Sequence, residues 1–561
     1  MRMGRFVLAA SGLGIVLALV LTHPLPWAPA TTVLDDGTHD PFQFMWNLWW
    51  VRASLVDGLG RPFFTRYLFY PDGISLLFHT YSFSLGLLSL PLQLLLPDGV
   101  VSAHNVLVVT APALCLVATA LLARAVTGDA AAALVGATVA VLNPIAVWFL
   151  PIIYLSCLWL VALLLWVWWE LHARRRGVLV MVALGVVAAL VFASQEYAMI
   201  ALGLLLLDTV VRAAAARRLA MPPLWAGGVI AFWIGCAIGM GGLASVALAE
   251  PAQTPPVIQL LLASGYLAGF VTPPWLSAPP APFWTVLYLG TAPLVVLPIA
   301  VWLGGRRAAF WLLGIGVTLA MALGPFVHLH HPLPELRMPP GGFKPTGPPG
   351  PYALAMALFP LLRFFRAPYR WVAIAQILLA VVTAFGIAGL RQRAGSAATR
   401  TVVTVGALAL ILALGALDVR GLRAPVVPAA VPAAYDVIRR DPEPSAILEL
   451  PSGPELDAFG FWSSYYMFYQ TVHRKFLLEG TVSRLPPGLT WVLARSFTDF
   501  TTVPYVKYVV VHRDLAERSY PSMQTQIAQT EAALATQGIP LVTDGPVRVW
   551  QLRTFRPETV R

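Results

Sequence analysis

The chain has 561 residues, of which 58% are hydrophobic and only 11% charged. An average soluble domain carries roughly 25% charged residues, so this composition excludes a soluble protein. The net charge of +11 comes mainly from arginines in short segments between apolar runs, which indicates membrane topology and not nucleic-acid binding. The cysteines also lie in apolar runs and predict neither a disulfide framework nor a metal site; they are Cys115, Cys157 and Cys236.

Long apolar runs follow one another from Phe6 to Leu417. A helix needs about 20 apolar residues to cross a bilayer, and short arginine-rich loops face the cytoplasm. The arginine-rich loops hold Arg124, Arg174 to Arg176, Arg212 to Arg218, Arg306 and Arg307, and Arg391 to Arg400. They predict about eleven spans: Phe6 to Leu25, Val101 to Ala123, Ala130 to Ala146, Leu155 to Leu171, Val178 to Ala193, Tyr197 to Val211, Leu224 to Leu248, Trp284 to Leu303, Ala308 to Val327, Trp371 to Leu390 and Thr401 to Leu417.

The first apolar run has two interpretations. Its basic start and the small residues Ala28 to Ala30 resemble a cleaved signal peptide, but we favour an uncleaved first helix with a cytoplasmic N-terminus. The run from Tyr81 to Leu96 is also apolar, yet counting it as a span would move Arg174 to Arg176 to the outside. We therefore expect Tyr81 to Leu96 to form an interfacial or re-entrant helix on the outer side.

The tail after Asp418 differs in character from the apolar region. β-rich stretches occur at Ala446 to Leu450, Tyr505 to Val511 and Val547 to Leu552, and a helix is expected from Ser522 to Gln537. We predict an α-helical polytopic membrane protein with a transmembrane domain over residues 1–420, which includes an outer loop at 26–79. Residues 421–561 are expected to form a small extracytoplasmic α/β domain, in a protein of the inner (plasma) membrane.

The span interiors are almost free of charge, and acidic residues gather in the outer loop, at Asp35, Asp36 and Asp40. This pattern disfavours an ion-coupled transporter and places the chemistry at the outer interface. Asp40 and Pro41 also suit the start of a helix, so capping is an alternative role. The helix that follows is rich in aromatic residues, which favour the headgroup region; among them are Phe44, Trp46, Trp49 and Trp50, with Asn47 between them.

Several motifs together carry a resemblance. They are D-P-x-x-F-x-W-N-L-W-W (Asp40 to Trp50), F-Y-P-D-G (Phe69 to Gly73), the helix end L-L-A-R-A-V-T-G-D-A-A-A-A-L-V-G-A (Leu121 to Ala137), F-R-A-P-Y-R-W (Phe365 to Trp371), L-E-L-P (Leu448 to Pro451) and Y-V-V-V-H (Tyr508 to His512). The chain resembles the GT-C superfamily of polyprenyl-phosphate-sugar-dependent glycosyltransferases, and within it uncharacterised bacterial membrane proteins. The resemblance extends along most of the membrane region as a pattern.

The resemblance implies an inverting transfer from a polyprenyl-phosphate sugar, with a loop carboxylate as general base. Asp40 is the first choice for that base and Asp36 the second, because the family places its catalytic acid in this loop. The implied substrate-binding residues are Arg363, Arg366 and Arg370 for the phosphate, because guanidinium groups bind phosphate oxygens bidentately, together with Trp46 and Asn47. Anchoring of the arginines to ordinary lipid is the alternative.

Glu196 and the cluster His328 to Glu335 each have two interpretations. Glu196 is either a second acidic residue of the site or a charge at a helix start. The cluster His328 to Glu335 offers metal ligands, but its prolines prevent regular helical spacing, so no metal ligand is assigned and a divalent metal stays open.

The expected partners are the lipid bilayer, a lipid-linked sugar donor and a glycan, glycolipid or protein acceptor in the cell envelope, and no nucleic acid. A non-enzymatic membrane protein is the alternative, either a flippase for lipid-linked sugars or an envelope-assembly scaffold.

Overall fold

The structure is a computed structural model, and it describes most of the chain. The described residues are 2–77, 79–96, 99–174, 178–216, 228, 230–235, 238, 257–276, 286–331, 347–359, 362, 365, 367–452, 462–483, 499–516 and 521–560. They form two compact units. Unit 1 comprises residues Met1–Pro26, Leu107–Gly241 and Thr254–Ala424, and unit 2 comprises Trp27–Val106, Gly242–Gln253 and Pro425–Arg561.

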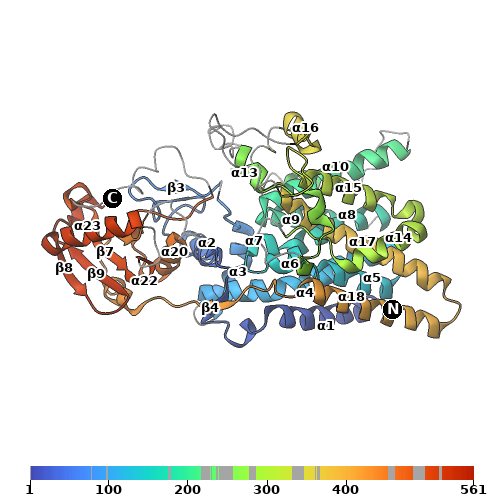
Figure 1. Cartoon of the computed structure of the whole chain (residues 1–561), viewed down its shortest axis with the longest axis horizontal. Coiled ribbons are helices and arrows are strands. Elements are labelled where there is room, and N and C mark those ends of the chain that lie inside the picture. The colour runs from blue at the N-terminus through green and yellow to red at the C-terminus, as the bar shows by residue number, and fades with distance from the viewer. Residues whose placement is uncertain are drawn as a thin grey trace. The chain divides into compact units, whose positions relative to one another are not determined.

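Unit 1 is helical (Figure 1). Its described α-helices are α1 (Met3–Thr22), α4 (Gly99–Thr127, which begins in unit 2), α5 (Ala130–Ala137), α6 (Pro144–Trp148), α7 (Ile153–Ser156), α8 (Leu158–Arg174), α9 (Val178–Leu190), α10 (Gln195–Ala216), α13 (Val257–Leu262), α14 (Thr291–Gly304), α15 (Ala309–Ala322), α16 (Pro351–Leu358), α17 (Trp371–Arg393) and α18 (Ala397–Asp418). Short 3-10 turns join several of them, among them η2 (Thr138–Ala140), η3 (Val191–Ala193) and η11 (Pro368–Arg370).

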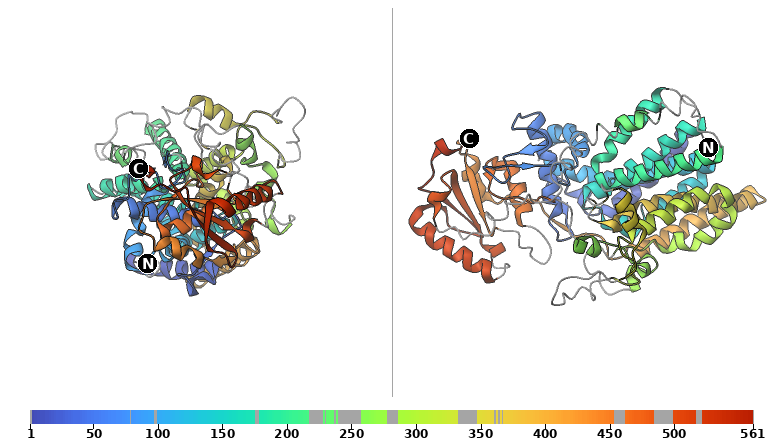
Figure 2. Two further views of the ribbon diagram at one scale, coloured as in Figure 1. Left: turned by 90° about the vertical axis from the view of Figure 1, so that its left-hand side faces the viewer. Right: turned by 90° about the horizontal axis from the view of Figure 1, so that it is seen from above.

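Helix α17 lies at the centre of unit 1. It packs against α5, α14, α15 and α18, and Figure 2 shows α14, α15, α17 and α18 side by side. A Cβ atom on Gly136 of α5 would lie 2.7 Å from the carbonyl oxygen of Ala380 in α17. Only glycine therefore permits this approach of α5 to α17.

Five helical segments of the described residues are long and apolar enough to cross a membrane. They are Met3–Thr22, Gly99–Thr127, Ile153–His172, Pro368–Arg393 and Ala397–Asp418. Each coincides with a predicted span, and the chain is a membrane protein. Apolar faces of α1 and α18 are exposed, as expected of helices in contact with lipid.

The remaining predicted spans have mixed outcomes. Helices α9, α10, α14 and α15 fall at predicted positions, whereas most of Leu224 to Leu248 lies outside the described residues. The predicted span from Ala130 to Ala146 is not one helix, because α5 and its 3-10 extension end at Ala140 and a new helix, α6, begins after Asn143. The Asn143 side chain accepts a hydrogen bond from the Ala146 amide (2.9 Å) and Pro144 opens α6. The total of eleven spans stays a prediction.

Unit 2 combines the first outer loop with the tail. Its loop elements are β1 (Thr32–Leu34), α2 (Asp40–Leu55), β2 (Phe64–Thr65), β3 (Ile74–Ser75) and α3 (Phe83–Leu95), the helix expected within Tyr81 to Leu96. The tail contains β4 (Val426–Pro428), α19 (Asp436–Arg439), β5 (Ala446–Leu450), α20 (Trp462–His473), β6 (Phe476–Leu477), β7 (Val506–His512), α22 (Arg513–Ala516), α23 (Pro521–Gln537), β8 (Gly538–Val542) and β9 (Val547–Leu552). The strands and the helix predicted in the tail are therefore present.

The tail forms a five-stranded mixed sheet in the order β6-β5-β7-β9-β8. Strand β5 is parallel to β6 and β7, and β9 is antiparallel to β7 and β8. One face of the sheet packs against α23 through Val509, Val511 and Ile527. Tyr508 and Val510 on the opposite face belong to the hydrophobic cluster that also contains the aromatic residues of α2 and α20.

The loop and the tail therefore share one core. Strand β1 of the loop pairs antiparallel with β4 of the tail, and backbone hydrogen bonds join Tyr67 and Tyr70 to Leu477 of β6. Residues 26–79 were predicted to belong to the transmembrane domain. In the structure the segment Trp27–Val106 forms one compact unit with the tail.

Candidate functional site

The acidic loop, residues 35–40, connects β1 to α2 in unit 2. Asp35 lies at its base with only 3% of its surface exposed. One carboxylate oxygen of Asp35 accepts the backbone N–H groups of Gly37 and His39 (both 3.1 Å), and the other lies 3.0 Å from Nδ1 of His39. Asp35 is thus fully engaged in shaping the turn, and its carboxylate is oriented toward the imidazole.

Asp36 has a different environment. Its Oδ1 atom accepts hydrogen bonds from the backbone N–H of Thr38 (3.1 Å) and from the Thr38 hydroxyl (2.5 Å). Its Oδ2 atom is buried and makes no hydrogen bond. Burial raises the pKa of Asp36 above its ordinary value of 3.8, although the Thr38 hydrogen bonds oppose the shift. Asp36 therefore combines a raised pKa with a buried acceptor oxygen that has no hydrogen-bond partner.

Asp40 is the first residue of α2, followed by Pro41, as the sequence predicted. Its carboxylate accepts a hydrogen bond from the side-chain amide of Gln43, one turn along the helix. A carboxylate in the first turn also interacts favourably with the helix dipole. The structure thus gives Asp40 a role at the start of α2, where its side chain is partly exposed.

His39 was not assigned a role from the sequence. Its backbone is left-handed (φ 61°), which is uncommon for a residue other than glycine. Its ring stacks near Trp462 of α20 (centroids 5.7 Å apart), and its Nδ1 lies 3.1 Å from the hydroxyl oxygen of Tyr465. The spacing of Asp35 and His39 was a weak signal, but Trp462 and Tyr465 are too distant in sequence to be predicted from it.

Trp46 and Asn47 lie inside unit 2 and not on its surface. Trp46 is fully buried and donates its indole N–H to Oε1 of Gln470 (2.6 Å). Asn47 donates to the carbonyl oxygen of Thr80 (3.2 Å), and its Oδ1 lies 3.0 Å from Nε2 of His79. The aromatic side chains of α2 were expected to meet lipid headgroups. In the structure, α20 of the tail packs over them instead.

In unit 1, the buried Arg370 forms an ion pair with the partly buried Glu196. Glu196 lies in the first turn of α10, and Nη1 of Arg370 donates to its Oε2 over 2.5 Å. The guanidinium also lies over the rings of Tyr154 (5.4 Å) and Tyr369 (5.8 Å). Arg370 is thus neutralised within the protein, although its Nε atom is buried without a hydrogen bond. Arg363 and Arg366 lie outside the described residues.

The two groups of predicted site residues belong to different units. Asp36, Asp40, Trp46 and Asn47 lie in unit 2, where α2 and the loop before it bring them together. Glu196 and Arg370 lie in unit 1, where they contact each other.

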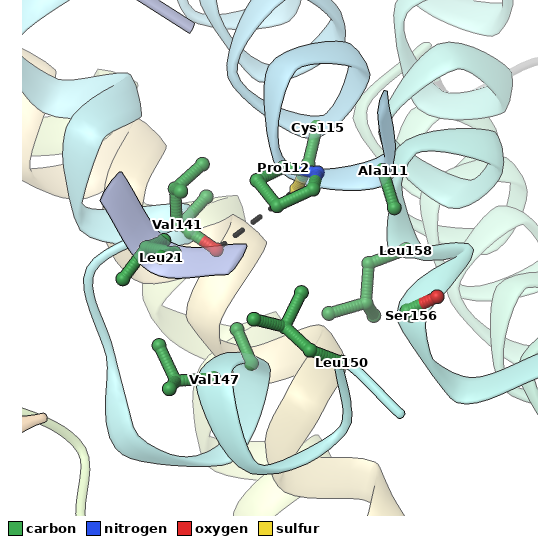
Figure 3. A pocket seen from close by; sticks show the side chains of 11 residues that line it. Leu21, Ala111, Pro112, Cys115, Val141, Val147, Leu150, Ser156 and Leu158 are labelled. Carbon is green, nitrogen blue, oxygen red and sulfur yellow. Dashed lines mark hydrogen bonds between the residues drawn. The ribbon is translucent and has the colours of Figure 1, made fainter. Parts of the chain in front are cut away.

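A small apolar pocket of about 20 Å³ lies in unit 1 (Figure 3). Most of its lining side chains are aliphatic, and among its few polar groups are the Cys115 thiol and the Ser156 hydroxyl. Ser156 belongs to α7, which also supplies Tyr154 beside Arg370. One short helix therefore connects the pocket wall to the Glu196–Arg370 ion pair.

The described residues contain no group of three or more histidine, cysteine, aspartate or glutamate side chains that could hold a metal ion. From the cluster His328 to Glu335, only residues 328–331 fall within the described part of the chain. No metal ligand is assigned.

Comparisons with known proteins give matches among solved structures alone. No family model and no curated protein matches the chain. Arabinofuranosyltransferase AftD from Mycobacteria matches with a TM-score of 0.53 at 14% identity, over 98% of this chain and 40% of AftD. The oligosaccharyltransferase AglB from Archaeoglobus fulgidus, solved with an inhibitory peptide and a dolichol-phosphate, matches with a TM-score of 0.47 at 12% identity, over 95% of this chain and 72% of AglB.

ArnT from Cupriavidus metallidurans, solved with undecaprenyl phosphate, matches with a TM-score of 0.39 at 12% identity, over 99% of this chain and 100% of ArnT. Identities this low concern the fold alone, and the AftD match, with a TM-score above 0.5, carries the comparison. This chain spans 40% of the length of AftD. The chain therefore has a GT-C-like fold.

Proposed function

We propose that the chain is a membrane glycosyltransferase that moves a sugar from a polyprenyl-phosphate donor to a cell-envelope glycan, glycolipid or protein. The reaction takes place on the outer face of the inner membrane, with the N-terminus in the cytoplasm and unit 2 outside. The GT-C-like fold supports the reaction class. The observation that carries the proposal is the acidic loop, in which Asp36 has a raised pKa and a buried oxygen without a hydrogen bond.

Asp36 is the general base of the proposed reaction. The acceptor hydroxyl oxygen attacks the anomeric carbon, the bond from that carbon to the phosphate oxygen breaks, and the electron pair leaves with the phosphate. The hydroxyl proton passes to Oδ2 of Asp36. Because attack and departure occur on opposite faces of the sugar, the configuration inverts. A base with a raised pKa is better matched to neutral pH than an ordinary aspartate.

Asp40 keeps a supporting role at the start of α2. This reverses the order predicted from the sequence, where Asp40 came first. The reason is that the Asp40 carboxylate already accepts a hydrogen bond from the Gln43 amide, whereas Asp36 has a buried oxygen without a hydrogen-bond partner. Arg363 and Arg366 remain the proposed phosphate ligands, and Glu196 holds Arg370.

The test is transfer of radiolabelled sugar from a panel of polyprenyl-phosphate donors into membranes that contain the full chain. The panel begins with a pentofuranose donor, because AftD is an arabinofuranosyltransferase. Asp36→Asn is expected to lower the rate by about 10²- to 10⁴-fold, the typical contribution of general base catalysis. Asp544→Asn, in the exposed turn between β8 and β9, makes the same chemical change and is expected to leave the rate unaltered.

Asp40→Asn separates the two carboxylates. If Asp40→Asn abolishes transfer and Asp36→Asn does not, the base assignment is wrong and the sequence-based order holds. If the wild-type chain transfers no sugar from any donor, the glycosyltransferase proposal fails, and the flippase or scaffold alternative takes its place.

A further inference from the structure

A hydrogen-bonded chain of three side chains joins the acidic loop to the tail. It runs from the Asp35 carboxylate through Nδ1 of His39 (3.0 Å) to the hydroxyl of Tyr465 in α20 (3.1 Å). An ionised carboxylate only accepts hydrogen bonds, so Nδ1 of His39 carries the proton and donates it. The single N–H at Nδ1 therefore faces two acceptors, the Asp35 carboxylate and the Tyr465 hydroxyl, in a three-centre hydrogen bond that fixes the imidazole plane.

The backbone of the loop depends on this arrangement. A residue other than glycine is uncommon in the left-handed region and persists there only where its surroundings hold it. His39 has φ 61°, and Asp35 Oδ1 binds its backbone N–H as well as that of Gly37. The left-handed turn lies between Asp36 and Asp40, so its conformation decides where both carboxylates lie.

Helix α20 closes the other side of the imidazole. The Tyr465 ring lies 4.7 Å from the His39 ring, between centroids, and the Trp462 ring is stacked with it at 5.7 Å. Phe42 of α2 also packs on Tyr465, with ring centroids 4.4 Å apart. The tail therefore contacts the acidic loop through aromatic packing and one hydroxyl, and α2 is fixed against the same helix.

We propose that Tyr465 is a positioning residue of the acidic loop, which acts through His39 to hold the turn that orients Asp36. The tail domain is then part of the catalytic unit and not an accessory module. This inference rests on the proposed glycosyltransferase function. Neither Tyr465 nor His39 takes part in the chemical step.

The activity test compares kcat and KM of the full chain with radiolabelled donor. Tyr465→Phe removes the hydroxyl and is expected to lower kcat about three- to tenfold, the effect of one hydrogen bond, with KM nearly unchanged. The matched control is Tyr505→Phe, a partly buried tyrosine of the same unit in the other hydrophobic cluster, which is expected to keep wild-type kcat. A Tyr465→Phe variant with wild-type kcat overturns the proposal.

Variants of His39 separate positioning from chemistry. Asparagine carries an amide nitrogen at the position of Nδ1 and adopts left-handed backbone more readily than most residues. His39→Asn is therefore expected to retain most of the activity, whereas His39→Ala loses it. If His39→Asn is as inactive as His39→Ala, the imidazole acts through Nε2 and the positioning role is refuted. The double variant His39→Ala/Tyr465→Phe is expected to be no worse than His39→Ala, because both changes break one chain of contacts.

Hydrogen exchange of the loop amides supplies a readout independent of transfer. The N–H groups of Gly37 and His39, both bound by Asp35, are expected to exchange faster in Tyr465→Phe than in the wild type or Tyr505→Phe. If wild-type transfer is absent but this increase is found, the proposed function fails and the positioning contact stands. Unchanged exchange in Tyr465→Phe refutes the positioning contact whatever the activity.

Discussion

The acidic loop of unit 2 and the Glu196–Arg370 pair of unit 1 hold carboxylates that the sequence presents in the same way, each at the start of a helix on the predicted outer side. Their partners differ. Asp36 accepts hydrogen bonds from neutral groups of Thr38 and has one oxygen without a partner. Glu196 is paired with a guanidinium that is itself buried. The comparison shows that the availability of a carboxylate for chemistry is set by its partner, which sequence position alone does not reveal.

The largest effect is expected when one member of the Glu196–Arg370 ion pair is removed. Arg370→Met leaves the partly buried Glu196 without its cation, which is expected to lower the free energy of unfolding by up to about 3 kcal/mol. The double variant Glu196→Gln/Arg370→Met removes both charges and is expected to recover much of that loss. Thermal unfolding of the detergent-solubilised chain measures both. A single variant as stable as the wild type shows that the pair is not a structural element.

The pH dependence of sugar transfer tests the role of Asp36 as the general base. A general base works when it is ionised, so the rate is expected to fall as the pH drops through the raised pKa of Asp36, about tenfold for each unit below it. The acidic limb of the kcat profile therefore lies above pH 3.8, the ordinary value for an aspartate. A limb at or below that value contradicts the assignment.

The same shift has a consequence for stability, with a sign that can be checked. Because the pKa of Asp36 is higher in the folded state, its contribution to stability is fully present below the ordinary aspartate pKa and is lost as the pH rises through the folded value. At neutral pH Asp36→Asn is therefore expected to unfold at the same temperature as the wild type or above it. An inactive variant that is also less stable points to a structural role for Asp36.

The smallest expected effect concerns the anchoring of α2. Trp46→Phe removes the indole N–H bound to Gln470 and leaves a buried acceptor unpaired, at a cost of about 1 to 3 kcal/mol beyond the lost volume. Trp50 is the matched control, since it is stacked on Trp46, equally buried, and its indole nitrogen makes no hydrogen bond. Trp50→Phe is thus expected to cost less. Equal losses of stability, measured by thermal unfolding, exclude a contribution from the Trp46 hydrogen bond.

Local patterns predicted much of the fold. Apolar runs at α1, α4, α8, α17 and α18 gave their spans, because composition and length determine what crosses a bilayer. Alternating apolar residues likewise predicted β5, β7 and β9. The start of α6 after Asn143 was not predicted, although Asn-Pro is a recognisable start of a new helix. The apolar character of Ala130 to Ala146 outweighed that signal.

The candidate site was predicted less completely, for a physical reason. The acidic loop and the start of α2 follow from adjacent residues, but the partners that decide their roles come from distant segments. Tyr465 is 426 positions from His39, and Gln470 is 424 positions from Trp46. Periodicity and motif spacing carry no information about such contacts. Trp46 therefore looked like a headgroup residue, although α20 covers it.

The pairing of β1 with β4 has a consequence for how the chain is made. Residues Thr32–Leu34 leave the ribosome early, and their partners Val426–Pro428 follow only after every predicted span of the membrane region has been synthesised. While the membrane helices are inserted, β1 therefore lacks its partner strand β4, and the acidic loop lacks its contacts with α20. Contacts of such high sequence separation form late, so assembly of unit 2 begins only after β4 and α20 have been synthesised. In a chain whose synthesis stops before the tail, the acidic loop lacks its contacts with β4 and α20. The candidate site therefore forms only when the tail has been synthesised.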